Sequence, residues 1–193
     1  MQKHIIIVGA GIIGAAVAYN QARAGAQVTG VDAGQAGATG ASIGWINASY
    51  YLNEEHYRLR VEGIAAWHRL EEAIDLPIEW SGSLCWEEGR LEARQDVLKR
   101  LGYSVEMIHA ERFAVLEPHV GQAPEQSLLL RDEGVAEPAA LAATILTHAQ
   151  RIGARLMRGL NVKGLARDGE RLYAIEADCS RCRVACSCGA IGP

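Results

Sequence analysis

The fold is decided by the stretch His4-Ile5-Ile6-Ile7-Val8-Gly9-Ala10-Gly11-Ile12-Ile13-Gly14 near the start of the chain. Its first half is rich in isoleucine and favours a buried strand, and its second half has the spacing Gly-x-Gly-x-x-Gly, which favours a tight turn into a helix. Gly9 permits the turn, Gly11 lets the backbone approach a diphosphate, and Gly14 lets the helix pack close to the strand. The positive helix N-terminus then faces the phosphates, so the stretch predicts a dinucleotide-binding unit.

The residues that follow support this interpretation, which glycine spacing alone does not establish. Ala18 is small enough to keep the helix close to the sheet, and Gly25 is placed to end the helix. A second strand over 27–31 leads into Asp32, 18 residues beyond Gly14, where an acidic side chain accepts hydrogen bonds from an adenosine ribose. Because this carboxylate repels the extra phosphate of NADP, the unit favours a dinucleotide without that group.

A secretory signal peptide is the alternative interpretation of the same residues. Lys3 and the mostly apolar run from Ile5 to Ala18 have the order of its basic and hydrophobic regions. The spaced glycines weaken such a helix, and a signal peptide gives no reason for Asp32 to end the next strand. We therefore favour the nucleotide-binding interpretation.

Composition indicates a soluble, globular, cytoplasmic protein. The chain has 193 residues, 49% of them hydrophobic, and a net charge of −4, so it has enough apolar side chains to bury a core. It has no basic run and no apolar stretch of membrane-spanning length, and neither nucleic acid nor a membrane span is expected. Cysteines crowd the end of the chain at Cys179, Cys182, Cys186 and Cys188. A zinc or iron–sulfur site is the minor alternative there, because no histidine lies nearby, and no metal site is predicted.

The middle of the chain departs from an alternating strand–helix pattern. The stretch 33–47 is rich in small residues, and Trp45 and Ile46 within it favour ligand contact over a flexible connector. Apolar residues at three- and four-residue steps predict an amphipathic helix over 54–75. Short strands and charged helices are expected in the segment 77–133, which is interpreted as an insertion.

The strand–helix pattern returns in the last part of the chain. Pro138 is placed at the first turn of a helix, and a further parallel strand is expected over 154–157. Strands over 160–166 and 171–176 flank Asp168-Gly169, a dipeptide typical of hairpin turns.

With these pieces in order, the sequence resembles the FAD-dependent oxidoreductases of the D-amino-acid oxidase type, a group that includes glycine oxidase, sarcosine oxidase and D-amino-acid dehydrogenase. The resemblance spans nearly the whole chain and depends on Ile5 to Gly14 with Ala18, Asp32, Gly40 to Ile46, Gly134 to Pro138, Gly153-Ala154 and the glycine turn at Gly189-Ala190. It implies an α/β fold, in which a Rossmann-like FAD-binding domain is formed by 1–76 and 134–193 and is interrupted by an α+β substrate segment over 77–133.

The resemblance also implies how FAD lies on the chain. Its pyrophosphate lies over the three glycines of the opening turn, its ribose on Asp32, its adenine near the backbone of Val162, and its isoalloxazine ring beside residues 41–46. The implied FAD-binding residues are Gly9, Gly11, Ile12, Gly14, Asp32, Ala33, Thr39, Ala41, Ser42, Gly44, Trp45, Ile46, Val162 and Gly189.

The activity that the resemblance implies is oxidation of a C–N bond in a small amine or amino acid. Hydride passes from the α-carbon to flavin N5, and water hydrolyses the resulting imine. An amine that binds in its neutral form needs no side-chain base, so no catalytic residue is assigned. Glu87, Glu88, His109 and His119 are expected to be exposed charged or polar residues rather than acid–base groups.

The end of the chain departs from the family pattern. Family members continue beyond the turn at Gly189, and the cysteine-containing stretch 177–188 replaces an acidic turn and a valine-rich strand. The chain is therefore expected to be an amino-terminal part that lacks a C-terminal partner segment and has little or no activity alone. A non-catalytic nucleotide-binding module is the first alternative. An NAD-dependent dehydrogenase is the second, because Asp32 suits either adenosine ribose.

Overall fold

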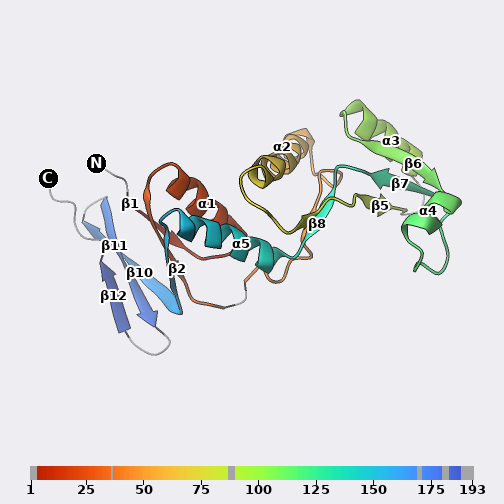
Figure 1. The fold of residues 1–193 in the computed structure, drawn as a ribbon. Helices are drawn as coiled ribbons and strands as arrows, with labels where there is room; N and C mark the ends of the chain where they lie inside the picture. The colour runs from red at the N-terminus through yellow and green to blue at the C-terminus, as the bar shows by residue number, and fades with distance from the viewer. Residues whose placement is uncertain (1–3, 36, 87–89, 169–170, 180–182, 188–193) are drawn as a thin grey trace. The chain divides into compact units, whose positions relative to one another are not determined.

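The computed structural model describes residues 4–35, 37–86, 90–168, 171–179 and 183–187. The chain divides into two compact units, which are shown in Figure 1. Unit 1 consists of Met1–Ile43 and Glu137–Pro193, and unit 2 consists of Gly44–Ala136. The segment 77–133, which the sequence analysis interprets as an insertion, lies within unit 2.

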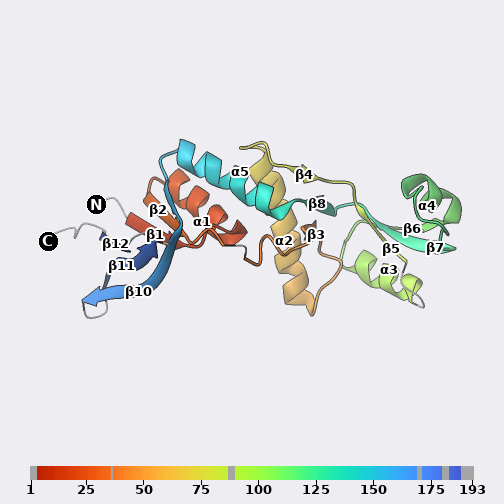
Figure 2. The same ribbon diagram turned by 90° about the horizontal axis from the view of Figure 1, so that it is seen from below.

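Unit 1 contains a parallel sheet that matches the predicted nucleotide-binding pattern. Its strands are β1 (His4–Val8), β2 (Gln27–Asp32) and β9 (Arg155–Arg158), in the order β1-β2-β9. Both neighbouring pairs are parallel. Helices α1 (Ile12–Arg23) and α5 (Pro138–Arg151) pack against each other and lie side by side in Figures 1 and 2.

Local sequence explains where these helices begin and end. The buried face of α1 is made of small side chains at Ala15, Ala18 and Ala22, together with Tyr19, which is why it packs closely on its neighbours. Helix α1 is followed by Gly25, whose φ of 82° is the left-handed conformation typical of a helix stop. The predicted proline at the start of α5 is confirmed, and the Glu137 side chain accepts hydrogen bonds from the first N–H groups of that helix.

The predicted hairpin of unit 1 is also confirmed as a strand pair. Strands β10 (Leu160–Asp168), β11 (Arg171–Cys179) and β12 (Arg183–Ser187) form an antiparallel sheet in that order. Buried residues of this sheet pack with β2 in a cluster of Val31, Leu160, Ile175 and Ala177. The turn residues 169–170 lie outside the described residues.

Unit 2 contains two antiparallel sheets. The first has the order β3-β8-β4 and is built from β3 (Trp45–Ile46), β8 (Gly134–Ala136) and β4 (Ile78–Glu79). The second has the order β5-β7-β6 and is built from β5 (Ser83–Cys85), β7 (Gln126–Leu130) and β6 (Val105–His109). Helices α2 (Glu54–Glu71), α3 (Leu91–Arg100) and α4 (Ala110–Leu116) complete the unit.

Helix α2 belongs to unit 2 because its apolar face is buried there. Tyr57 and Ile64 of α2 lie in a core that also contains Ala48, Cys85, Leu98, Tyr103, Leu128 and Leu130. The periodicity predicted a helix with a buried face but did not show which residues cover that face. This is why the sequence assigned α2 to the first domain. The helix also ends at Glu71 rather than at the expected residue 75.

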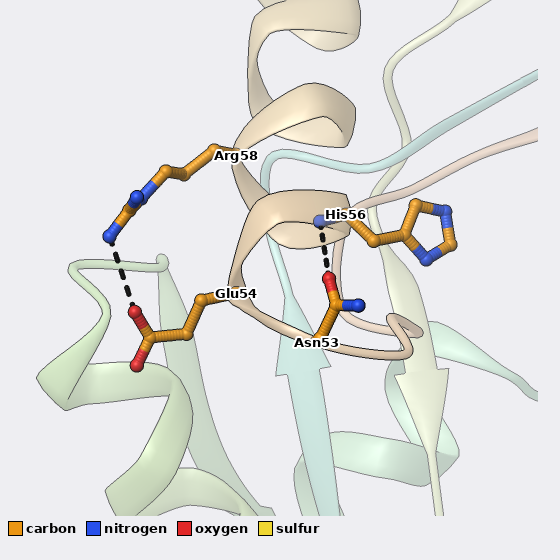
Figure 3. Close-up of polar contacts among 4 residues, drawn as sticks. All are labelled: Asn53, Glu54, His56 and Arg58. Carbon is orange, nitrogen blue, oxygen red and sulfur yellow. Dashed lines mark hydrogen bonds and ion pairs between the residues drawn. The ribbon is translucent and has the colours of Figure 1, made fainter.

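The start of α2 is held by side chains that Figure 3 shows. Asn53 is the N-cap residue, and its Oδ1 accepts a hydrogen bond of 2.9 Å from the His56 N–H. Glu54 and Arg58 form an exposed ion pair of 3.2 Å, one helical turn apart. In the described part of the chain, no helix combines the length and apolar character needed to cross a membrane.

Candidate nucleotide-binding site

The turn between β1 and α1 has the conformation that the glycine spacing predicted. Gly9 adopts a φ of 96°, which residues with a side chain rarely adopt, and its N–H donates to the Val31 carbonyl over 2.8 Å. This hydrogen bond fastens the turn to the end of β2. The turn therefore lies beside Asp32, which follows Val31 directly.

Gly14 is required by close packing. A Cβ atom built on Gly14 would lie 2.0 Å from the Gly9 carbonyl oxygen and 3.5 Å from the Ile7 side chain. No other residue type fits there unless the helix moves. The structure thus confirms that Gly14 lets α1 approach the preceding strand and turn.

Gly11 is constrained by a contact that the sequence did not predict. A Cβ atom on Gly11 would lie 2.7 Å from the Thr39 hydroxyl oxygen. That same oxygen accepts a hydrogen bond of 3.0 Å from the Ile12 N–H, the first residue of α1. Thr39 therefore takes the role of an N-cap side chain from 27 residues away along the chain.

Asp32 is held in place through both oxygens of its carboxylate. Oδ2 accepts a hydrogen bond of 2.8 Å from the Ala10 N–H, and Oδ1 accepts one of 2.7 Å from the Gly34 N–H. A carboxylate has about four acceptor positions, so two positions remain for donors such as ribose hydroxyls. The carboxylate is thereby oriented before any ligand arrives.

The N-terminus of α1 has the chemistry of an anion site. No acidic residue lies in its first turn, and the N–H groups of Gly11, Ile13 and Gly14 donate to no acceptor among the residues that the structure describes. Unpaired N–H groups and the helix dipole together favour a phosphate at this position. The Thr39 hydroxyl, which accepts the Ile12 N–H, also carries a proton that it can donate.

The structure gathers most of the predicted site residues in unit 1. Contacts among Gly9, Gly11, Ile12, Gly14, Asp32 and Thr39 form the site described above. Ala33 follows Asp32 directly, and Ala41 and Ser42 lie in the same turn as Thr39, where the Ser42 N–H donates to the Thr39 carbonyl over 3.3 Å. Val162 lies on β10 and packs against the cluster that contains Val31. Gly189 lies outside the described residues.

The remaining predicted residues, Gly44, Trp45 and Ile46, belong to unit 2. Gly44 adopts a φ of 71°, and its carbonyl accepts a hydrogen bond of 3.1 Å from the Ala136 N–H. Trp45 and Ile46 form β3 beside β8. The Trp45 indole N–H donates to the Glu133 carboxylate over 3.0 Å. This stretch is therefore held by strand pairing with β8 and by a hydrogen bond to the buried Glu133.

Glu133 was missed by sequence reasoning. Its side chain has no solvent exposure and accepts hydrogen bonds from Trp45, Ser49, Ser83 and Tyr103. Burial, followed by the negative charge of Glu133, raises the pKa of Tyr103 well above its ordinary value of 10.0. The sequence shows only an acidic residue before Gly134, and nothing local indicates that it is buried.

Two of the four charged or polar groups considered for acid–base roles lie among the described residues. His109 and His119 are exposed, as predicted, whereas Glu87 and Glu88 lie outside the described residues. Within the described ranges, no cluster of histidine, cysteine and acidic residues has the arrangement of a metal site. Cys182 and Cys188 are not among those residues.

Comparisons with known proteins agree with this fold. The family model described as FAD dependent oxidoreductase (DAO) matches residues 4–191. Glycine oxidase from Bacillus cereus ATCC 14579 has a TM-score of 0.80 at 18% identity, over 97% of this chain and 53% of its own. Iminodiacetate oxidase from Chelativorans sp. BNC1 has a TM-score of 0.73 at 25% identity, over 92% and 51%.

A third similar structure contains the cofactor. It is the dithionite-reduced L-alpha-glycerophosphate oxidase from Mycoplasma pneumoniae with FAD bound, with a TM-score of 0.72 at 20% identity, over 92% of this chain and 49% of its own. The chain thus spans about half the length of these solved structures. No curated protein sequence matches it at a significant level.

Proposed function

Because this chain belongs to the FAD-dependent oxidoreductase family, for which the cofactor is FAD, we propose that unit 1 binds the adenosine diphosphate half of FAD. We further propose that the enzyme of which these residues form a part oxidises a C–N bond of a small amine or amino acid. The substrate class is supported by the structural similarity to glycine oxidase and iminodiacetate oxidase.

One observation carries the proposal for the cofactor. Asp32 is fixed by the N–H groups of Ala10 and Gly34 over 2.8 and 2.7 Å, directly beside a helix N-terminus that lacks an acidic residue. An acceptor for ribose hydroxyls and a set of donors for phosphates therefore lie next to each other, as an adenosine diphosphate group requires.

Each group of residues has a proposed role. The N–H groups of Gly11, Ile13 and Gly14 and the Thr39 hydroxyl bind the pyrophosphate, with Gly9 shaping the turn, and Asp32 binds the ribose. Ile12 and Ala33 flank these groups, and the backbone of Val162 meets the adenine. The family resemblance assigns Ala41, Ser42, Gly44, Trp45 and Ile46 to the isoalloxazine ring and Gly189 to the glycine turn.

The chemistry in this proposal is divided between cofactor and protein. FAD, when bound, supplies an acceptor for the hydride that leaves the substrate carbon. The residues of this chain bind and orient the cofactor, and no side chain of theirs is assigned to a proton transfer. In this proposal, unit 1 is the cofactor domain and unit 2 is part of the substrate domain.

The proposal is tested by titrating the purified chain with FAD and following quenching of flavin fluorescence. We expect Asp32→Ala to weaken binding by about 10- to 100-fold, because it removes two hydrogen bonds to the ribose and releases the turn. Asp75→Ala, at an exposed position after α2, is the matched control and is expected to bind FAD like the unmodified chain. Equal affinity of both variants would refute the assigned role of Asp32.

A non-catalytic nucleotide-binding module is the second candidate, because the contacts of the candidate site concern nucleotide binding alone. Adding glycine, sarcosine or a D-amino acid to the FAD-loaded chain distinguishes the two. Loss of the visible absorbance of oxidised flavin shows that the substrate has been oxidised. We expect FAD to bind without such bleaching, and competition with NADH tests the preference for flavin.

A further inference from the structure

The Thr39 hydroxyl group occupies the space in which a side chain at position 11 would begin. A Cβ atom built on Gly11 would lie 2.7 Å from Thr39 Oγ1 and 3.7 Å from Thr39 Cβ, and no other described atom lies within 4 Å of it. Non-bonded heavy atoms pack at about 3.5–4.0 Å, so the first contact is a clash and the second is ordinary packing. Among the described residues, the Thr39 hydroxyl alone excludes a side chain at position 11.

The backbone of Gly11 does not itself require glycine. Its φ of −70° and ψ of −177° lie in the extended region that every residue type adopts, in contrast to Gly9 with its φ of 96°. The usual reason for glycine at the second position of this pattern is close approach of the backbone to a diphosphate. In this chain, a contact within the protein excludes larger residues before any ligand binds.

The Thr39 hydroxyl cannot leave this place without releasing the start of α1. Oγ1 accepts the hydrogen bond of 3.0 Å from the N–H of Ile12, the first residue of that helix. The Thr39 backbone is held in a turn, where its carbonyl accepts a hydrogen bond of 3.3 Å from the Ser42 N–H. Rotation about χ1 to another staggered rotamer would relieve the clash, but it would also take Oγ1 away from Ile12. A methyl group at position 11 therefore breaks the cap that Thr39 provides.

This cap bears on the N–H groups that the proposed function assigns to the pyrophosphate. The N–H of Ile12 lies between those of Gly11 and Ile13 along the chain, so the hydrogen bond to Thr39 fixes the direction of the donors on either side. Donors that are oriented before a ligand arrives bind it with a smaller loss of conformational entropy. The acceptor oxygen of Thr39 is therefore placed to influence the affinity for a diphosphate.

We infer that Thr39 is a positioning residue of the diphosphate site, and that its hydroxyl group, rather than the bound phosphates, is what requires glycine at position 11. Its effect on affinity rests on the proposed function, whereas the coupling between Thr39 and Gly11 exists in the ligand-free chain. The second glycine of the pattern and the turn 37–42 thereby act as one unit.

The test is a double-mutant cycle in the full 193-residue chain, with the dissociation constant for ADP measured by calorimetry. Gly11→Ala and Thr39→Ala are each expected to weaken ADP binding by about tenfold, because each breaks the cap of α1. In the Thr39→Ala chain, the nearest described atom to the new Cβ is the Cβ of residue 39, at 3.7 Å. Gly11→Ala should change the affinity of that chain by less than about twofold. Equal fold-changes in the two backgrounds would overturn the inference.

Hydrogen exchange of the Ile12 amide, followed by NMR without ligand, measures the coupling directly. We expect this amide to exchange at least about tenfold faster in Gly11→Ala and in Thr39→Ala than in the unmodified chain, and to stay slow in Thr39→Ser, which keeps the hydroxyl group. Gly37→Ala is the matched control in the same turn, because a Cβ atom there meets no described atom within 4 Å. It is expected to leave both the exchange rate and the affinity for ADP unchanged.

The outcomes separate this inference from the proposed function. Absence of ADP binding to the unmodified chain would overturn the proposed function, and the exchange of the Ile12 amide would still decide whether Thr39 and Gly11 are coupled. Slow exchange of that amide in Gly11→Ala would overturn the inference alone. If Gly11→Ala does not fold, recovery of folding in the double variant supports the coupling, and a double variant that is unfolded while Thr39→Ala is folded overturns it.

Discussion

Replacing Gly14 by alanine tests the packing on which the nucleotide site depends. The new Cβ would lie 2.0 Å from the Gly9 carbonyl oxygen, about 1 Å closer than such atoms approach in folded proteins. Gly9 cannot relax freely, because its φ of 96° and its hydrogen bond to Val31 fix the turn. Helix α1 must therefore move away from β1.

The magnitude follows from two opposing terms. Overpacking of this kind costs about 1–3 kcal/mol or more, whereas alanine in place of glycine within a helix gains about 0.5–1 kcal/mol. Because the clash is with a backbone oxygen, the upper end of the overpacking cost applies, and we expect a net loss of about 2 kcal/mol in the free energy of unfolding for Gly14→Ala. This is a large fraction of the stability of a domain, typically about 5–15 kcal/mol.

Gly63 provides the matched control, because it lies inside α2 and a Cβ atom there meets no atom within 4 Å. Gly63→Ala is expected to raise the free energy of unfolding by about 0.5–1 kcal/mol. Both values are measured by urea denaturation followed by far-UV circular dichroism. Tryptophan fluorescence adds a separate signal for unit 2, because Trp45, Trp67, Trp80 and Trp86 all lie in that unit. A Gly14→Ala chain as stable as the unmodified one would refute the close packing of α1 on the turn.

Further predictions concern single side chains. The Ser127 hydroxyl is buried and has no hydrogen-bond partner among the described residues, so Ser127→Ala should leave the free energy of unfolding unchanged or raise it by about 1 kcal/mol; a clear loss in urea denaturation would contradict this. Because burial raises the pKa of Tyr103 in the folded state above its ordinary value of 10.0, its contribution to stability is present below that pH and is lost as the pH rises above it. The urea concentration at the unfolding midpoint should therefore decrease as the pH rises above about 10, and it should decrease less steeply in Tyr103→Phe. An equally steep decrease in both chains would count against a buried Tyr103. Thr39→Ser should bind ADP like the unmodified chain, whereas Thr39→Val, which cannot accept the Ile12 N–H, should bind about tenfold more weakly in a calorimetric titration; equal binding of the two variants would remove Thr39 from the site.

The nucleotide-binding unit is the part of the fold that sequence predicted best, because its determinants are local. Gly9 and Gly14 have the conformation and close packing expected from their spacing, and Asp32 ends the second strand of the sheet. Helix stops also depend on neighbouring residues. Gly25 and Gly153 both adopt a positive φ directly after a helix, where a glycine costs least.

Contacts between distant parts of the chain were not predictable from such patterns. Thr39 binds the Ile12 N–H across 27 residues, and no spacing rule connects the two. The amphipathic pattern of α2 predicted a buried face, but the partners of Tyr57 and Ile64 come from later segments of unit 2. Glu133 is an acidic residue that sequence alone places at the surface, and only the convergence of its donors explains its burial.

In the proposed function, the turn between β1 and α1 binds a diphosphate while Asp32 binds the adjoining ribose. It is tested most directly by titrating the ¹⁵N-labelled chain with ADP and following its backbone amide signals by NMR. We expect the signals of Gly11, Ile13 and Gly14 to move, because their N–H groups face the phosphates. Those of Ala10 and Gly34, which donate to Asp32 over 2.8 and 2.7 Å, should move with them. Unchanged signals at these positions while others move, or no response at millimolar ADP, would contradict the account.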